Sequence, residues 1–545
     1  MKDMINKMNV NWKIFTPSIL IMVLVSIPFV FNEGGALEIL NGIFDWIALN
    51  FGWGYLWYAV ISMAVAFWFA CSKYGNIVFG DPNKKPEFSM TSFIAIKIAM
   101  AIGSSLMRTG LIHWASIAGN EPMGMESWSM EAIAFGQSHS MFLWSLPKMA
   151  ILVVAAPAFA YMMHNRKNNS SKVSEVFRYI WGDKFADGIG GKAVDVLFLV
   201  SIIAGASTFI GFGAPIITHT VGHLFNLEVT FNLAMFITFA WTICFTVSAT
   251  LGLKKSIQFL SNFNMWLAGI FAILILLLGP GAFIMNFFTD TMSVHLSTFG
   301  NMVLHTGALE GTGGSVQSFN IFWFAYSATW ALLHAAFAAK ISRGRTLREM
   351  ILVYLFAPLA LAYLGTAVLG GLSIERFITG VVDVPGIAET AGTAIASIPV
   401  VIQSLPMGTI MLFIFLILTF LFMVTTMDTT SFTIAMYAAN DDQSAEEPSR
   451  GIRIFIGIVI GAIALVLMRI GGLAPLEVLS GLMGIPIIFV VFVLVFAAKK
   501  MMDEDKAWLT NVRPAKITTL KTTELNKPVE NEVKVDEEIE LTLTM

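Results

Sequence analysis

The amino-acid sequence predicts an all-α membrane protein that crosses the bilayer twelve times. Three observations lead to this prediction: the composition, the length of the apolar segments and the placement of the basic residues between them. Of the 545 residues, 56% are hydrophobic and 13% are charged, whereas soluble proteins carry about 25% charged residues. The mean hydropathy of +0.75 indicates a chain in lipid, and the net charge of −3 gives no indication of a nucleic-acid partner.

Twelve apolar segments are long enough to cross the hydrocarbon core, which takes about 20 helical residues. None of them shows the two-residue alternation of barrel strands, so each is expected to be a helix. The third segment is long enough to be tilted or broken. The predicted spans are residues 13–31, 53–71, 90–118, 139–162, 192–214, 231–252, 259–287, 319–340, 349–372, 406–427, 453–470 and 475–498.

Basic residues alternate between the connections of these spans. The even-numbered connections all contain Lys or Arg, and the odd-numbered ones contain none except Arg376. Because Lys and Arg near a span resist translocation, both termini are expected in the cytoplasm and the chain in the plasma membrane. The chain divides into a cytoplasmic N-terminus 1–12, a twelve-helix membrane domain 13–498 and an acidic tail 499–545, expected to be disordered.

The connection after the eighth span carries the most specific motif. The aromatic stretch N-I-F-W-F-A-Y-S-A-T-W leads to I-S-R-G-R-T-L-R-E at residues 341–349. The stretches P-E-F-S, G-I-G-G-K-A-V-D-V-L, G-F-G-A-P-I and V-T-T-M-D-T-T-S follow the same family pattern, in order. Over about residues 85 to 498 the sequence resembles the betaine/choline/carnitine transporter (BCCT) family, as a divergent member.

This resemblance implies a LeuT-type fold and secondary transport by alternating access. Spans 3–7 and 8–12 would form two inverted five-helix repeats, preceded by two extra helices, with the substrate near the membrane midplane. The resemblance also implies a homotrimer. No nucleophile-base pair, metal spacing or phosphate loop indicates an enzyme, and no cofactor is expected beyond Na⁺ as a coupling ion.

Two neighbouring hydroxyls of the tenth span are candidates for ion binding. Thr425 and Thr426 coincide with a sodium-binding pair of sodium-coupled relatives, in which backbone carbonyls of the third span, here around Ser104 and Met107, complete the site. Oxygen ligands suit a hard cation. Alternatively, both hydroxyls bond back to their own helix, as Thr in membrane helices commonly does.

The third span departs from the family pattern. The glycine-rich break of the relatives aligns with L-M-R-T-G at residues 106–110, which places Arg108 where a glycine would touch the substrate. An intramembrane Arg needs a partner. Three interpretations remain open: Arg108 pairs with Glu121 or Asp428, it binds an anionic group of the substrate, or it replaces the coupling cation.

The fourth and eighth spans hold only part of the aromatic cage that binds trimethylammonium groups in relatives. Trp144 matches one cage position, but the others fall on Met149 and Leu152, and Lys148 lies beside them. These aromatics would otherwise be packing residues. The expected substrate-binding residues are Arg108, Trp144, Lys148, Met149, Tyr326, Ser327 and Trp330.

Two cations and an incomplete cage favour a zwitterionic or anionic organic solute, such as a carboxylate or sulfonate, over a bare cation. Sodium-coupled uptake is the leading prediction. The alternatives are a sodium-independent exchanger of a quaternary ammonium compound and a sensor that binds solute without moving it. His113 and His334, both within spans, are candidates for titration during transport.

Overall fold

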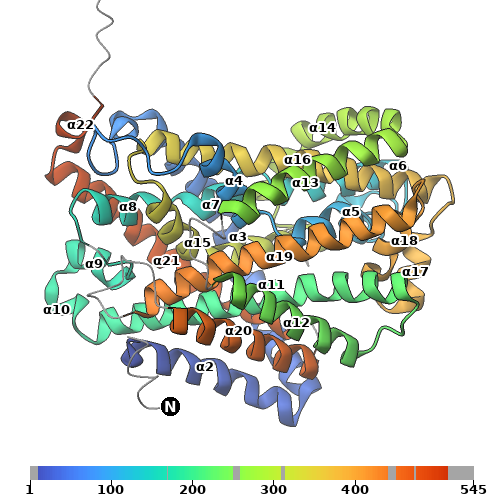
Figure 1. The fold of residues 1–545 in the computed structure, drawn as a ribbon, viewed down its shortest axis with the longest axis horizontal. Coiled ribbons are helices and arrows are strands. Elements are labelled where there is room, and N and C mark those ends of the chain that lie inside the picture. The colour runs from blue at the N-terminus through green and yellow to red at the C-terminus, as the bar shows by residue number, and fades with distance from the viewer. Residues whose placement is uncertain are drawn as a thin grey trace, which may run out of the picture.

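The computed structural model describes residues 10–168, 170–249, 258–307, 314–439, 450–471 and 474–513. Long helices that cross one another make up the body of the molecule (Figure 1). Within these described residues, nine helices are long and apolar enough to cross a membrane, and a bent helix pair makes a tenth. The all-helical prediction is therefore confirmed at this coarse level.

Ten of the predicted spans coincide with these ten candidates, namely the second to the tenth and the twelfth. In chain order the helices are α3 (Glu33–Cys71), the bent pair α4 (Met90–Ala101) and α5 (Ser104–Ala118), the series α6 (Met130–Phe142), α7 (Leu146–Val153) and α8 (Ala156–His164), α11 (Ile189–Phe225), α12 (Phe231–Ala249), α13 (Gln258–Leu278), α15 (Gly314–Ile341), α16 (Leu347–Ile378), α19 (Gly408–Ala438) and α21 (Ala474–Glu504).

The first and eleventh predicted spans correspond to α2 (Trp12–Phe31) and α20 (Arg450–Gly471). Both are helical, but neither is among the ten candidates found in the described part of the chain. The count of twelve spans and the inverted repeats therefore stay predictions.

Two helices begin earlier than expected, so the predicted connections 32–52 and 119–138 are wrong in extent. Helix α3 has 39 residues and starts after Asn32, whose side chain accepts a hydrogen bond from the Gly35 amide. Helix α6 starts after Ser129, which accepts one from the Ala132 amide. Acidic residues such as Glu38 and Asp45 lower the hydropathy without interrupting the helix, which explains the error.

The two longest predicted connections, residues 288–318 and 373–405, contain helices in the structure. The seventh span ends at Leu278 instead of residue 287, and α14 (Gly281–Leu304) follows it as a separate helix of 24 residues. The other connection contains α17 (Val384–Ala391), η4 (Ala394–Ala396) and α18 (Ser397–Gln403). Figure 1 shows α17 and α18 together at one end of the bundle.

The opposite end of the bundle, which we call the basic end, gathers the Lys- and Arg-rich connections. There the Gly344 amide donates to the Phe79 carbonyl, and the Arg345 guanidinium donates to the Phe88 carbonyl. Residues 499–513 also belong to this end, because α21 continues to Glu504 and is followed by α22 (Ala507–Thr510). The tail from residue 514 onward lies outside the described residues.

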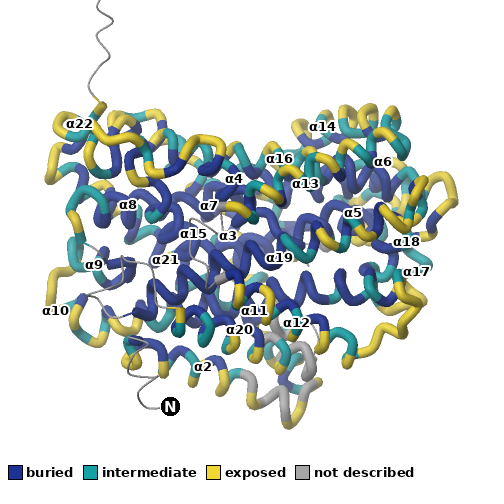
Figure 2. Tube along the Cα trace, in the orientation of Figure 1, coloured by how far each residue is buried: buried dark blue, intermediate teal, exposed yellow. Residues whose placement is uncertain are grey.

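Burial identifies the centre of the bundle. In α15 and in the α6–α8 series, 94% of the residues in the span are buried inside the protein, compared with 22% in α13 and 28% in α12. Figure 2 shows this buried interior surrounded by partly exposed outer helices. Polar groups in α15 and α6–α8 therefore face protein or an internal cavity, and that is where a binding site is expected.

Candidate functional site

The candidate site is built around the break between α4 and α5. The two helices are bent by 57°, and the residues between them are Ile102 and Gly103. A Cβ atom added to Gly103 would lie 2.4 Å from the Phe209 ring and 3.2 Å from Thr426 Oγ1. Glycine is therefore required where α11 and α19 approach the broken backbone.

The expected position of the break, residues 106–110, is wrong by about one helical turn. These residues lie within α5. Gly110 is a packing residue, because a Cβ there would lie 3.2 Å from Leu369 Cδ1 of α16. The glycine at the break is Gly103, which was not considered from the sequence.

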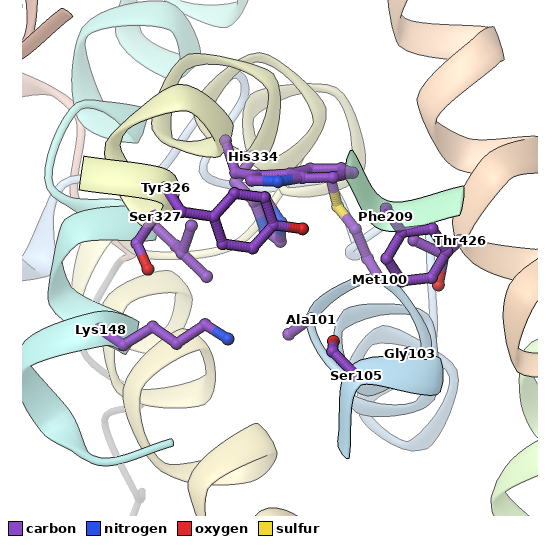
Figure 3. Close-up of a pocket in the computed structure, with 12 residues that line it drawn as sticks. Met100, Ala101, Gly103, Ser105, Lys148, Phe209, Tyr326, Ser327, His334 and Thr426 are labelled. Atoms are coloured by element: carbon purple, nitrogen blue, oxygen red, sulfur yellow. The ribbon is translucent and has the colours of Figure 1, made fainter. Parts of the chain in front are cut away.

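A small cavity lies beside this break. It is enclosed by α4, α5, α7, α11, α15 and α19, and none of its lining residues is acidic (Figure 3). The lining residues are Met100, Ala101, Gly103, Ser105, Lys148, Leu152, Phe209, Tyr326, Ser327, Trp330, His334 and Thr426. The cavity thus combines a freed backbone, several aromatic rings and one primary amine.

The amine of Lys148 lies between the cavity and two indole rings. Its Nζ atom is 3.4 Å from the ring centroid of Trp144 and 4.3 Å from that of Trp323. Figure 3 shows the Lys148 side chain extending from α7 toward the break. The side chain is 6% exposed, and it forms no ion pair with the residues that the structure describes. An ammonium group placed over aromatic faces is stabilised by their quadrupoles, but it keeps its need for a counter-charge.

Hydrogen bonds hold both indole rings in place. Trp144 Nε1 donates to Thr109 Oγ1 over 2.8 Å, and Trp323 Nε1 donates to the Leu143 carbonyl over 2.6 Å. The two rings meet edge to face, with centroids 5.9 Å apart. The seat of the Lys148 amine is therefore formed by α5, α7 and α15 together, and it is fixed before any ligand binds.

A second buried amine, that of Lys97 on α4, lies behind the cavity wall. Lys97 is fully buried, its Nζ is 3.1 Å from His334 Nδ1, and it lies 4.0 Å from the Tyr354 ring centroid. In its ammonium form Lys97 would donate to Nδ1, and His334 would then carry its proton at Nε2. In the described part of the chain, Lys97 also lacks a carboxylate partner.

Comparison with protein families shows to which family the chain belongs. The family model described as "BCCT, betaine/carnitine/choline family transporter" matches residues 13–507, nearly the whole chain. The chain belongs to the BCCT family. It is accordingly an integral membrane protein and a secondary transporter, not an enzyme, of a family whose solutes are of the betaine, carnitine and choline type.

In this BCCT transporter the two candidate ion-binding hydroxyls face different partners. Thr426 Oγ1 lies 3.2 Å from the Ala99 carbonyl, in the last turn of α4, and 2.9 Å from the Phe422 carbonyl of its own helix. Thr425 Oγ1 lies within 3.1 Å of two carbonyls of its own helix and accepts from Asn264 Nδ2. Only Thr426 therefore points to the break.

The carbonyl that approaches Thr426 is not one of those expected. Carbonyls in the last turn of a helix have no partner within the helix, so the end of α4 leaves that of Ala99 available. The Ser104 hydroxyl is buried without a hydrogen bond in the described structure. Met107 belongs to an apolar pocket between α5, α13, α16 and α19. Whether any of these groups binds an ion stays a prediction.

Arg108 does not line the central cavity. It belongs to a neighbouring pocket that shares Ser105 with the cavity and includes Thr393 next to η4. Its guanidinium carbon is 4.9 Å from the Phe212 ring centroid. Glu121 forms no ion pair within the described residues, and Asp428 lies in the uninterrupted α19, where it accepts from Ser248 Oγ.

The structure thus divides the expected substrate-binding residues into three groups. Four of them line the cavity: Lys148, Tyr326, Ser327 and Trp330. Trp144 lies behind the Lys148 amine and contacts it. The other two lie elsewhere, Arg108 in the neighbouring pocket and Met149 fully buried in α7.

Several residues of the site were missed in the sequence. Lys97 had a clear signal, because it is the one charged residue in F-I-A-I-K-I-A-M-A. Phe209 and Trp323 had none, because their roles depend on contacts between distant helices. His113, a candidate for titration, lines the pocket of Arg108 and is linked to His139 by an Nε2 to Nδ1 distance of 3.0 Å; its titration stays a prediction.

Proposed function

We propose that this BCCT transporter takes up a small zwitterionic or anionic organic solute, with a carboxylate or sulfonate group, by alternating access. The observation that supports this most directly is the acid-free cavity at the α4–α5 break with the Lys148 amine on its wall. A buried ammonium without a counter-ion is costly, and an anionic group on the solute would supply the missing charge.

We also propose that Na⁺ drives the uptake, with Thr426 as the principal protein hydroxyl at the ion site. This is supported by the position of Thr426 Oγ1, which lies 3.2 Å from the Ala99 carbonyl at the break. A hydroxyl and a freed carbonyl are hard oxygen ligands of the kind that an alkali cation takes. Thr425, which faces Asn264 on α13, would contribute less.

The proposed setting follows the family. A LeuT-type pair of inverted repeats is supported by the broken α4–α5 helix, which faces α15 across the cavity. The plasma membrane, with both termini in the cytoplasm, is supported by the basic residues of the even-numbered connections. A homotrimer rests on the family alone.

Uptake into proteoliposomes tests the proposal. Labelled betaines, carboxylates and sulfonates are offered with and without an inward Na⁺ gradient. We expect accumulation of at least one anionic or zwitterionic solute, and a Na⁺ gradient should increase it. Thr426→Ala should abolish the effect of Na⁺, since the hydroxyl is lost from the break. Thr433→Ala is the matched control, because among the described residues the Thr433 hydroxyl bonds to the Thr429 carbonyl of its own helix alone.

Two results would contradict the proposal. Selective uptake of choline would exclude a cavity that prefers anionic groups. Counterflow that is equally fast without Na⁺, in both the wild type and Thr426→Ala, would exclude the ion site and favour an exchanger.

A further inference from the structure

We infer that Lys148 acts as a tethered cation that takes the place of a substrate ammonium group, so that the solute of this transporter is an organic anion without a positive group of its own. This inference rests on the proposed function and narrows its substrate class. It makes Lys148 the specificity-determining residue of the cavity.

The first step is the occupancy of the aromatic seat. A cation over the faces of Trp or Tyr is the usual way in which proteins recognise ammonium compounds. Here the Trp144 and Trp323 faces already hold a cation, the Lys148 amine, at 3.4 and 4.3 Å from their centroids. A solute ammonium cannot use the same faces while Lys148 remains there.

The second step is the charge of the cavity wall. No lining residue is acidic, and a second amine, that of Lys97, lies beside His334 of the lining. A positive group on the solute would add a third cation in a low-dielectric environment. A negative group, in contrast, would neutralise charge that the described residues leave uncompensated.

The third step is the remaining shape of the cavity. The lining also includes the rings of Phe209, Tyr326 and Trp330, which suit an apolar or weakly polar body. Ser327 Oγ donates to the Trp323 carbonyl of its own helix, over 2.6 Å. The amine of Lys148 is therefore the strongest donor that faces the solute, and a carboxylate or sulfonate is its natural partner.

The test compares two ligands that differ in charge and hardly in shape. Glycine betaine is a zwitterion, and 3,3-dimethylbutanoate is its isostere with carbon in place of the ammonium nitrogen. Binding to the detergent-purified full-length protein is measured by ligand-induced thermal stabilisation, with isethionate and acetate as smaller anions. We expect the wild type to bind the isostere at least about tenfold more tightly than betaine.

Substitution of the tethered cation should reverse this preference. Lys148→Met keeps the length of the side chain and removes its charge, so betaine should gain and the isostere should lose affinity, changing their ratio by about a hundredfold. Lys148→Gln provides a second variant in case Met impairs folding. Lys499→Met is the control, since Lys499 is half exposed and paired with Asp503, and it should leave the ratio unchanged.

The outcomes separate this inference from the proposed function. Tighter binding of betaine than of its isostere by the wild type, or no stabilisation by any of the anions, overturns the inference. A ratio that is the same in the wild type and both Lys148 variants overturns it as well. Anion binding without transport would support the inference and reject the proposed function, because the binding measurement does not require transport.

Discussion

The basic end of the bundle and the central cavity both contain basic side chains, but these side chains have different partners. At the basic end, the Arg166 guanidinium is 2.7 Å from Glu504 and 2.9 Å from Asp505. Arg178 binds three carboxylates in the same way, those of Glu175, Asp183 and Asp187. At the cavity, the Lys148 amine on the wall and the Lys97 amine behind it lie over aromatic rings, and Lys97 also lies beside a histidine; neither forms an ion pair with the residues that the structure describes.

The difference indicates two separate roles for positive charge. The ion pairs of Arg166 join the end of α8 to the end of α21, and those of Arg178 join α9 (Val173–Trp181) to α10 (Asp183–Ala186) and the residue after it. Each such pair contributes modestly to stability. Charged amines that are buried without a carboxylate destabilise the ligand-free protein, because no ion pair offsets the free-energy cost of removing the charge from water. Their presence in a BCCT transporter is therefore better explained by a ligand than by folding.

The largest effect is expected from filling the cavity at the helix break. Gly103→Val should reduce uptake of the solute by about 100-fold or more, because even a Cβ would lie 2.4 Å from the Phe209 ring. Uptake into proteoliposomes at equal amounts of protein measures the effect. This variant removes the cavity while it leaves the basic end intact.

The control for this variant is Gly54→Ala in α3, where an added Cβ meets no atom within 4 Å. It should transport normally. If Gly103→Val still transported at more than about a tenth of the wild-type rate, the solute would have to bind elsewhere, and the contrast between the two regions would lose its basis.

A smaller effect is expected from removal of the second buried amine. Lys97→Met should weaken anion binding by about tenfold, since a positive charge is lost near the cavity. The melting temperature should be unchanged or higher, because a buried amine without a carboxylate partner is replaced by an apolar side chain of similar length. Ligand binding and thermal unfolding of the purified protein measure the two quantities.

The exposed Lys192 provides the control, and Lys192→Met should alter neither quantity. A clear fall in melting temperature together with unchanged affinity would show that Lys97 is structural. Lys97 would then stabilise the fold, as the ion-paired residues of the basic end do, and would have no role in ligand binding.

The smallest effect is expected at the basic end. Burial alone would raise the pKa of Asp505, but hydrogen bonds from Arg166 and Tyr161 outweigh it and lower this pKa below its ordinary value of 3.8. A lowered pKa stabilises the fold above pH 3.8 and loses this contribution as the pH falls through the lowered value. Asp505→Asn should therefore lower the melting temperature by about 1 °C at pH 7, with unchanged uptake.

Melting curves of the wild type and Asp505→Asn, recorded from pH 7 downward, measure this effect. The two melting temperatures should approach each other below pH 3.8 and converge once the pH is below the lowered pKa of Asp505 in the folded protein, where the carboxyl is protonated in both states. A difference that persisted or widened in acid would contradict the assignment of Asp505 to the network of Arg166.

Much of the fold was predictable because long apolar segments leave few alternatives in a membrane. The errors arose where hydropathy and helix geometry diverge. Glu38 and Asp45 made the first half of α3 look like a connection, although acidic residues continue a helix readily. Gly279 and Pro280 separate α13 from α14 within a stretch that reads as one apolar run.

The site was predictable only where a residue is unusual for its surroundings. Lys148 stands out in an apolar helix, and it does line the cavity. Lys97 has the same signal and was overlooked. The break could not be located from Gly103 alone, because its need for glycine comes from Phe209 and Thr426 on other helices. The contact between the Trp144 and Trp323 rings likewise depends on packing, because Trp144 lies in the turn before α7, and α7 packs against α15.

The most direct test of the account is an electron cryo-microscopy map of the protein with its tightest-binding anion. We predict density for the solute in the cavity beside Gly103, with its acidic group about 3 Å from Lys148 Nζ. The Lys148 amine should remain over the Trp144 ring. A positive group of the solute over Trp144 and Trp323, with the Lys148 side chain displaced, would contradict the account.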